Sequence, residues 1–523
     1  MLTVPAFGEE KIFENKQNEY ATVWVMENAE SDLFDRYCAL LSEEGYALKE
    51  AYNHSARRFA AFLNAEGEGV FLNDYRGNRE LSLVREKETA YFSYADASRA
   101  CPAKPTQITQ VHLEDFGMSY VIRLSDGRFI IFDGGCNFEP DRDRLFQCLK
   151  DGSPDDEKPV IAAWIMTHPH SDHYFCFFGF MEQYENEVVI EKFLFNFPEY
   201  DDLEHYPKLK TPELMEKGTA AFINIPKFLA WVEKIGAPVY TPRSGQRYQI
   251  GNASCEILSC MDDTMHSSNK INAISLMIRM ELEGQVILWS TDASFSFARI
   301  PQRYGSYLKA DILQIPHHGF QCGDADAEVA GYDLIQPKVC FLPVSDDNAY
   351  SIFCTYKEGT HHIMRNVGVE EIITGTKQRT ITLPYTAPAY AKRELEEKFL
   401  LGRESAGARV WIFSDLSTDC PEDFNFTILN ATIHPTPFLI DLYFEDRARA
   451  VLNIRAEVAG YCVKELSVIG DEVDGDWEWL DRCSLKVRGI PESSRFAVRF
   501  RSEKPLVVTH KKHAASYHST LNG

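Results

Sequence analysis

The chain has 523 residues, of which 45% are hydrophobic and 25% charged, with 30 Gly and 24 Pro, as in folded globular proteins. Its 54 Lys and Arg against 78 Asp and Glu give a net charge of −24 at pH 7. This composition excludes a disordered or collagen-like chain. The acidic balance disfavours extended nucleic acid and anionic membranes as partners, since both bind clustered Lys and Arg.

No targeting or membrane segment is expected from the sequence. The first twenty residues lack a basic region followed by an apolar run. The most apolar run, Tyr174 to Met181, is far shorter than the roughly 18 residues of a membrane span. The 13 cysteines are odd in number and never spaced as CxxC. This usage indicates reduced thiols in a cytoplasmic protein and disfavours structural zinc on cysteine.

Residues 1–104 are predicted to form a small α+β accessory domain. Ala21 to Met26 has the composition of a strand, and Ser31 is the expected N-cap of an amphipathic helix that ends at Gly45. Strands separated by Gly and Asn turns are expected between residues 57 and 86. Nothing in this part of the sequence predicts chemistry.

Residues 105–385 alternate short apolar strands with helical stretches, which predicts layered helices and sheets. A strand over 128–133 ends in a Gly-Gly turn, and a helix is expected over 141–152. Residues 159–168 form a continuous apolar run, which is typical of a strand buried on both faces. Further strands are expected over 188–197, 274–282, 285–292, 311–318, 337–345 and 370–376.

Residues 386–523 begin with a basic, helix-prone link over 390–404 and then lose helical periodicity. Strand-like runs follow at intervals of roughly 10 to 20 residues, which predicts a C-terminal β-sandwich. These strands are expected over 410–415, 425–433, 438–445, 450–458, 483–490 and 495–502. The polar residues from 510 onward are expected to fray.

The sharpest chemical signal is Thr167-His168-Pro169-His170-Ser171-Asp172-His173, directly after a buried strand. It places three imidazoles and a carboxylate within six residues, and these are ligands that divalent transition metals prefer. Pro169 favours an extended His168, and Ser171 or Asp172 can begin the following helix. A chance histidine cluster at a strand end is the alternative interpretation.

Two further strand ends carry the same kinds of residue. Asp292 ends an apolar strand, where a charge needs a partner, although it could instead cap a helix. Pro316-His317-His318-Gly319 ends another strand, although adjacent histidines there are commonly solvated. Because sites gather at the strand ends of layered α/β folds, the three signals support one another.

These elements, in this order, resemble the metallo-β-lactamase fold superfamily of metal-dependent hydrolases over roughly residues 105–385. The segment from Asn272 to Ser294 and the later His-His-Gly look most like the branch related to the metallo-hydrolase domain of DNA-uptake (competence) proteins. The resemblance implies an α+β fold, an αββα sandwich with metals at one edge. This domain would lie in the chain between the small N-terminal domain and the C-terminal β-sandwich.

The resemblance also implies roles for individual residues. It assigns the first metal to His168 and His170, the second to Asp172, His173 and His317, and a bridging position to Asp292. His318 is the alternative to His317, because neighbours on one strand point opposite ways. Asp133, in the FDGG element, is expected to orient a ligand.

The sequence departs from the family pattern at the first metal. Many members place another His after the strand that follows the motif, but the nearest candidate here is Asn196. His205, in the loop beyond, is a less favoured alternative. The resemblance therefore implies a first site that is short of imidazole and is either weak or exchangeable.

Other positions near the motif are open to two interpretations. Tyr174, Phe175 and Cys176 replace the small residues usual after the motif, and packing in the core is favoured over narrowing of a pocket. Three more residues are candidates for the pocket, with surface or packing roles as the alternative: His266, Asn272 and Tyr350.

Together these features predict a metal-dependent hydrolase. Two divalent ions, zinc or else manganese or iron, lower the pKa of a shared water, and the resulting hydroxide attacks a carbonyl carbon or a phosphorus. Asp172 is the expected proton acceptor. The expected substrate is a small phosphoester, or a related ester, lactone or thioester, and the motif does not choose among them.

Two other classes of function compete with this hypothesis. One is a non-catalytic metal-binding scaffold whose flanking domains bind a partner. The other is oxygen reduction at a di-iron site, which needs a flavin domain, and the sequence has no glycine-rich phosphate loop that would mark one. A small molecule is the expected partner of the central domain, and the oligomeric state is left open.

Overall fold

The computed structural model describes residues 11–16, 21–87, 89, 104–115, 117–154, 157–198, 224–264, 271–346, 348, 349, 352, 367–392, 395, 410–430, 435–445, 450–460, 462–470, 475–481, 484–502 and 506–510. For 11–16, 410–412, 414, 415, 421 and 422 only the backbone is described. The chain divides into two compact units, 1–349 with 358–387 and 350–357 with 388–523. Each unit is treated by itself.

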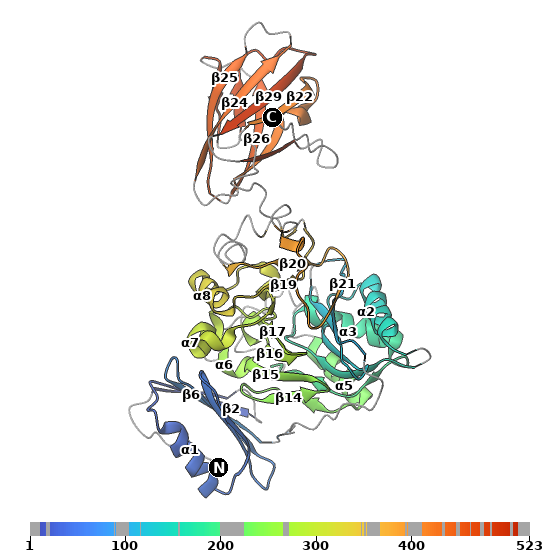
Figure 1. The fold of residues 1–523 in the computed structure, drawn as a ribbon, viewed down its shortest axis with the longest axis vertical. Coiled ribbons are helices and arrows are strands. Elements are labelled where there is room, and N and C mark those ends of the chain that lie inside the picture. Colours follow the sequence, from blue (N-terminus) through green and yellow to red (C-terminus); the bar gives the residue numbers. More distant parts are fainter. Residues whose placement is uncertain are drawn as a thin grey trace. The chain divides into compact units, whose positions relative to one another are not determined.

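The first unit opens with a six-stranded antiparallel sheet in the order β1-β2-β6-β5-β4-β3 (Figure 1). The helix α1 (Leu33–Glu43) packs its apolar side on one face of this sheet. The strands are β1 (Lys11–Lys16), β2 (Ala21–Glu27), β3 (Ala47–Asn53), β4 (Arg57–Leu63), β5 (Gly69–Tyr75) and β6 (Glu80–Glu86).

The N-terminal α+β prediction needs three corrections, one of which is that the strand β1 (Lys11–Lys16) was not expected. Asp32, not Ser31, occupies the N-cap of α1, and the Ser31 carbonyl instead accepts a hydrogen bond from Arg58 Nη2 at 2.9 Å. The strand β3 was not expected, because its side chains are largely exposed and its sequence lacks an apolar alternation.

Two further sheets pack face to face in the middle of the first unit. One has the order β13-β12-β10-β9-β8-β7-β21, with β11 beside β10. Its strands are β7 (Gln107–Gln110), β8 (Ser119–Arg123), β9 (Phe129–Asp133), β10 (Val160–Ile165), β11 (Val189–Ile190), β12 (Phe193–Leu194), β13 (Val239–Tyr240) and β21 (Arg379–Thr382).

The other central sheet has the order β14-β15-β16-β17-β18-β19-β20. Aromatic side chains join the two sheets: the Trp289 ring lies 4.5 Å from that of Phe132 and 5.0 Å from that of Tyr120. The strands are β14 (Arg247–Ile250), β15 (Ala253–Ser259), β16 (Met277–Leu282), β17 (Gln285–Trp289), β18 (Ile312–Gln314), β19 (Val339–Leu342) and β20 (Glu371–Thr374).

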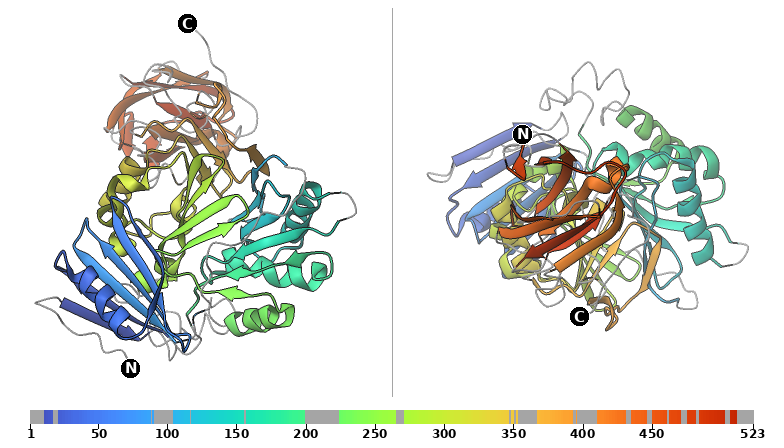
Figure 2. Two further views of the ribbon diagram at one scale, coloured as in Figure 1. Left: turned by 60° about the horizontal axis from the view of Figure 1, so that its bottom comes forward. Right: turned by 90° about the horizontal axis from the view of Figure 1, so that it is seen from above.

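Helices cover the outer faces of the central sheets (Figures 1 and 2). The helices α2 (Glu139–Gly152), α3 (Ser171–Tyr184) and α5 (Ile225–Ile235) pack against the first sheet. Beside the second lie α6 (Met261–Thr264), α7 (Ile300–Tyr304) and α8 (Ala325–Ile335). This arrangement confirms the predicted α+β fold of layered helices and sheets. Among the described helices, none has the length and apolar character that crossing a membrane requires.

Parallel strands bring the loops of interest to one edge of each sheet. The strands β9 and β10 are parallel neighbours, as are β17, β18, β19 and β20. Parallel neighbours end at the same edge, so the residues that follow them meet there. Asp133 ends β9, the histidine motif follows β10, and Asp292 and His317–His318 follow β17 and β18.

The second unit contains two sheets that share one apolar core, which agrees with the predicted β-sandwich. The orders are β22-β29-β24-β25 and β27-β28-β26-β23-β30. The link over 390–404 and the terminus beyond 510 lie almost wholly outside the described residues. The strands are β22 (Val410–Ser417), β23 (Asn425–Asn430), β24 (Thr436–Phe444), β25 (Val451–Val458), β26 (Cys462–Gly470), β27 (Trp477–Trp479), β28 (Ser484–Val487), β29 (Arg495–Ser502) and β30 (Val507–His510).

Candidate metal centre

Asp133 connects the end of β9 to the histidine motif. Its Oδ1 accepts the backbone N–H of Thr167 at 2.7 Å, and its Oδ2 accepts the Thr167 hydroxyl at 2.7 Å. The same Oδ2 lies 2.7 Å from Nδ1 of His173. All three residues are fully buried. The carboxylate therefore fixes the His173 ring with Nε2 left to face the cluster.

The first group of potential ligands consists of His168, His170 and Asp292. Nε2 of His168 lies 2.9 Å from Nδ1 of His170 and 3.5 Å from Oδ2 of Asp292. One ligand atom from each residue falls within 4.8 Å of the others. Three side chains thus converge from the ends of β10 and β17.

The second group consists of Asp172, His173, Asp292 and His318. Nε2 of His173 lies 3.3 Å from Nε2 of His318 and 3.2 Å from Oδ1 of Asp292. Nε2 of His318 lies 3.1 Å from Oδ2 of Asp172. Asp292 belongs to both groups, one oxygen facing each, and its side chain is 1% exposed. Among the described residues, it is the one that the two groups share.

Charge is unevenly distributed over the cluster. Burial, with the neighbouring His173 and His170, holds the pKa of His168 well below its usual value, and burial lowers the pKa of His170 to about 4. Burial also opposes protonation of His318, but Asp292 and Asp172 outweigh it and raise the pKa of His318 to about 9. The first group therefore offers neutral imidazoles, the form that binds metals.

The second group faces an excess of carboxylate charge. Burial alone would raise the pKa of Asp292, but the His173 and His318 rings hold this pKa well below its usual value. The pKa of Asp172 is likewise lowered by His173 and His318, against burial. Such a group stabilises positive charge, which protons or a cation can supply.

The structure places His318, and not His317, with the second group. The two histidines do not continue β18 as alternating strand residues, because both adopt left-handed backbone angles, with φ of 47° and 54°. Nδ1 of His317 lies 3.0 Å from the Phe320 carbonyl oxygen. The strand expected to 318 ends at Gln314, so strand alternation could not decide between the neighbours.

Other candidate residues lie apart from the two groups. Asn196 is buried, and its amide donates to the Pro242 carbonyl oxygen at 3.1 Å. The ring of Tyr174 packs against Phe197 and Phe228. Asn272 lies in the short helix Ile271–Ile274, where none of its described contacts reaches the cluster. Three candidates fall outside the described residues: His205, His266 and Tyr350.

Sequence reasoning missed the residues that hold the ligand turns together. The Leu276 N–H donates to the Thr167 carbonyl at 3.1 Å, and the Thr291 hydroxyl donates to the Leu276 carbonyl at 2.9 Å. Thr167 and Thr291 directly precede His168 and Asp292. Their adjacency to ligands was the available signal, but their partner Leu276 is distant in sequence.

A cleft of about 160 Å³ is lined by residues that include no member of either ligand group. The N–H of Met118, which follows the lining residue Gly117, donates to the Asp172 carbonyl at 3.0 Å. No Lys or Arg occurs among the described residues that line it, whereas Glu114 and Asp115 do. The lining residues come from the segments 111–117, 343–348 and 375–376.

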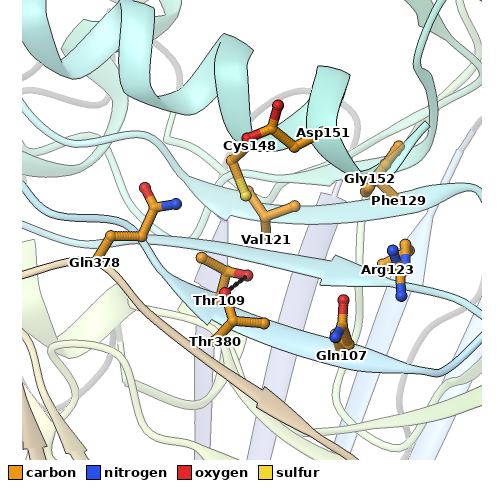
Figure 3. A pocket seen from close by; sticks show the side chains of 10 residues that line it. All are labelled: Gln107, Thr109, Val121, Arg123, Phe129, Cys148, Asp151, Gly152, Gln378 and Thr380. Carbon is orange, nitrogen blue, oxygen red and sulfur yellow. Dashed lines mark hydrogen bonds between the residues drawn. The ribbon is translucent and has the colours of Figure 1, made fainter. Parts of the chain in front are cut away.

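A second hollow, of about 140 Å³, lies between β7, β8, β21 and the end of α2 (Figure 3). Arg123, Gln107 and Gln378 line it, and the hydroxyls of Thr109 and Thr380 lie 2.8 Å apart on its floor. It contains no member of either ligand group.

The donor set of the cluster suits divalent metal ions. Ring nitrogens of His168 and His170, and of His173 and His318, face each other at 2.9 and 3.3 Å. Imidazole and carboxylate donors arranged in two groups around a shared carboxylate match the requirements of two neighbouring ions.

Residues 113–243 match the family model described as the metallo-beta-lactamase superfamily. The chain contains a metallo-β-lactamase superfamily domain. The match covers the Asp133 turn and the histidine motif, and the fold of this metallo-β-lactamase domain implies binding of divalent metal. Members of the superfamily are mostly metal-dependent hydrolases.

Solved structures are also similar to parts of the chain. Igni18, a metallo hydrolase from the archaeon Ignicoccus hospitalis, is 11% identical, with 53% of this chain and 100% of that chain covered and a TM-score of 0.30. The short form of human tRNase Z is also 11% identical, with 53% of this chain and 100% of that chain covered and a TM-score of 0.31. The Anabaena sensory rhodopsin transducer is 23% identical, with 20% and 84% covered and a TM-score of 0.15.

These TM-scores are too low to support an inference about function. A search of curated proteins finds none that matches. The metallo-β-lactamase domain therefore rests on the family model and on the architecture of the two central sheets.

Proposed function

We propose that this protein is a hydrolase that uses two divalent metal ions, zinc in the first instance, on a small phosphoester or a related small ester. The observation that supports the proposal is the pair of ligand groups that share Asp292. The first metal would be held by His168 and His170, and the second by Asp172, His173 and His318. Two ions at such a site supply activation of water and of the substrate oxygen.

The protein's own residues would orient the metal ligands and accept the proton that the reaction releases. Asp133 holds His173 through the Nδ1 of that imidazole. It also holds the turn before His168, through its hydrogen bond from Thr167. Asp172 is the carboxylate we assign as proton acceptor, because its side chain is 17% exposed whereas that of Asp292 is 1% exposed. A proton that reaches Asp172 can therefore pass to solvent.

The cleft that includes Gly117, whose neighbour Met118 bonds to the Asp172 backbone, offers little to a polyanion. Its described lining offers carboxylates, hydroxyls, an amide and the imidazole of His112 but no Lys or Arg. A long nucleic acid needs several cations along its backbone. The likeness to the DNA-uptake branch is therefore a proposal about ancestry and not about substrate. The cytoplasmic location and the domain limits at 104 and 385 are proposals as well.

Turnover of simple chromogenic esters tests the proposed function. Metal-loaded protein should hydrolyse bis(p-nitrophenyl) phosphate or a p-nitrophenyl ester, and Asp172→Ala should lower the rate by about 100-fold or more, as expected for loss of general acid–base catalysis. Glu182→Ala is the matched control, because Glu182 is an exposed carboxylate on the same helix α3. Metal binding without turnover of any ester would favour the scaffold instead.

A further inference from the structure

Two buried aspartates in the central domain face the N-terminal sheet. Asp262 and Asp263 lie in the short helix α6 and are 3% and 2% exposed. Carboxylates at this depth need partners, because burial of an unpaired charge is costly. The partners of Asp262 and Asp263 therefore show which elements fix α6 in place.

Two buried arginines join these aspartates to strand β6 of the N-terminal sheet. Arg243 donates from Nη1 to Oδ1 of Asp262 at 2.6 Å and from Nη2 to Oε1 of Glu86 at 2.9 Å. Both ends of the Arg243 guanidinium are thus occupied, one by each domain. A single side chain therefore connects α6 to β6.

Arg303 makes a second connection of the same kind. It donates from Nη1 to Oδ1 of Asp263 at 2.7 Å and from Nη2 to Oε1 of Glu80. Tyr75, on strand β5, adds a hydroxyl bond to Oδ1 of Asp263 at 3.3 Å. Arg303 and Glu80 are 1% and 4% exposed, so this contact is shielded from water.

The chain that continues from α6 leads to the metal centre. The Thr264 hydroxyl donates to the Ala273 carbonyl at 2.9 Å, which ties α6 to the short helix Ile271–Ile274. Leu276 follows, and its backbone bonds join it to Thr167 and Thr291. We call the described residues 260–264 and 271–276 the bridging segment. One end of it is fixed to the N-terminal sheet, and the other touches the turns that precede His168 and Asp292.

We propose that the N-terminal sheet positions the metal centre: Glu80 and Glu86 fix the bridging segment through Arg303 and Arg243, and this segment fixes the turns of His168 and Asp292. Metal ligands must be held within about 0.5 Å of their working positions, and their supporting residues set that precision. Glu80 and Glu86 are positioning residues, not catalytic ones. The inference rests on the metal centre of the proposed function, but not on its substrate.

The test is the double variant Glu80→Gln, Glu86→Gln in the full-length protein. Each glutamine keeps an oxygen acceptor, and Asp263 and Asp262 still neutralise the arginines, so the fold should persist. We expect cobalt(II) affinity, measured by competition with a chelator, to fall about fivefold or more. We also expect the visible absorption bands of bound cobalt to shift, because the ligand turns relax.

Glu256→Gln is the matched control. Glu256, on β15, is 5% exposed and bonds to Arg57 on β4 of the same N-terminal sheet, but it lies outside the bridging segment. It should lower thermal stability while leaving cobalt affinity and spectrum unchanged. If the double variant lowers stability yet binds cobalt as the wild type does, the sheet has only a structural role and the inference fails. If the wild-type protein binds no cobalt, the proposed function itself fails.

Discussion

At the scale of single residues, the cluster owes its geometry to Asp292 and Asp133. Asp292 offers one oxygen to each ligand group, and Asp133 fixes both Thr167 and His173. The sequence could indicate Asp292, because a charge after an apolar strand needs a partner, whereas Asp133 was assigned only through the family resemblance. The prediction preferred His317, whereas the structure groups His318 with the other ligands, and this choice depends on left-handed backbone angles that no local sequence pattern predicts.

The two neighbouring histidines give a direct test at this scale. We expect His318→Ala to weaken the binding of one of the two metal ions by about 100-fold or more, since even supporting residues around a metal contribute 10–100-fold. His317→Ala should bind both ions nearly as the wild type does, because its Nδ1 faces the Phe320 carbonyl. Equilibrium dialysis with metal analysis measures both, and the reverse pattern would contradict the assignment.

At the scale of elements, the sequence predicted what apolar periodicity encodes. Strands β9, β10 and β17, buried on both faces, were expected close to their observed limits. The exposed strand β3 was missed, since without a buried face it lacks an alternating pattern. The strands β8, β15 and β26 were also missed, although each has buried side chains. The hydrogen bonds of Leu276 could not be predicted for a different reason. The one with Thr167 joins segments more than one hundred residues apart in the sequence.

A buried glutamate on α8 makes stability depend on pH. Burial raises the pKa of Glu328 to about 7, although its hydrogen bond from Ser294 acts in the opposite direction. A raised pKa in the folded state means that the stabilisation is complete below about pH 4.5 and is lost as the pH rises through about 7. The full effect is on the order of 3 kcal/mol.

Glu328→Gln should remove this dependence. We expect the variant to gain free energy of unfolding relative to the wild type as the pH rises from 5 to 8.5, measured by urea denaturation. Asp326→Asn, an exposed carboxylate on the same helix, serves as the control and should show no such trend. A constant difference between Glu328→Gln and the wild type across this range would disprove the assignment.

At the scale of the whole molecule, the acidic chain and the metal centre are compatible. The net charge of −24 disfavours a polyanionic partner, yet bound divalent ions reverse the local field at the cluster. The N-terminal sheet, which has no chemical signal in its sequence, lies in the same compact unit as the centre and connects to it through Arg243 and Arg303. Such a role is invisible in sequence because its partners are distant along the chain.

The number of metal ions bound per chain tests the central claim most directly. Purified protein, dialysed to equilibrium against zinc and analysed for metal, should hold two ions per chain. Asp292→Ala should weaken the binding of both ions, because both ligand groups use this carboxylate. A wild-type protein that binds one ion or none, or an Asp292→Ala protein that retains both ions at wild-type affinity, would contradict a shared two-metal centre.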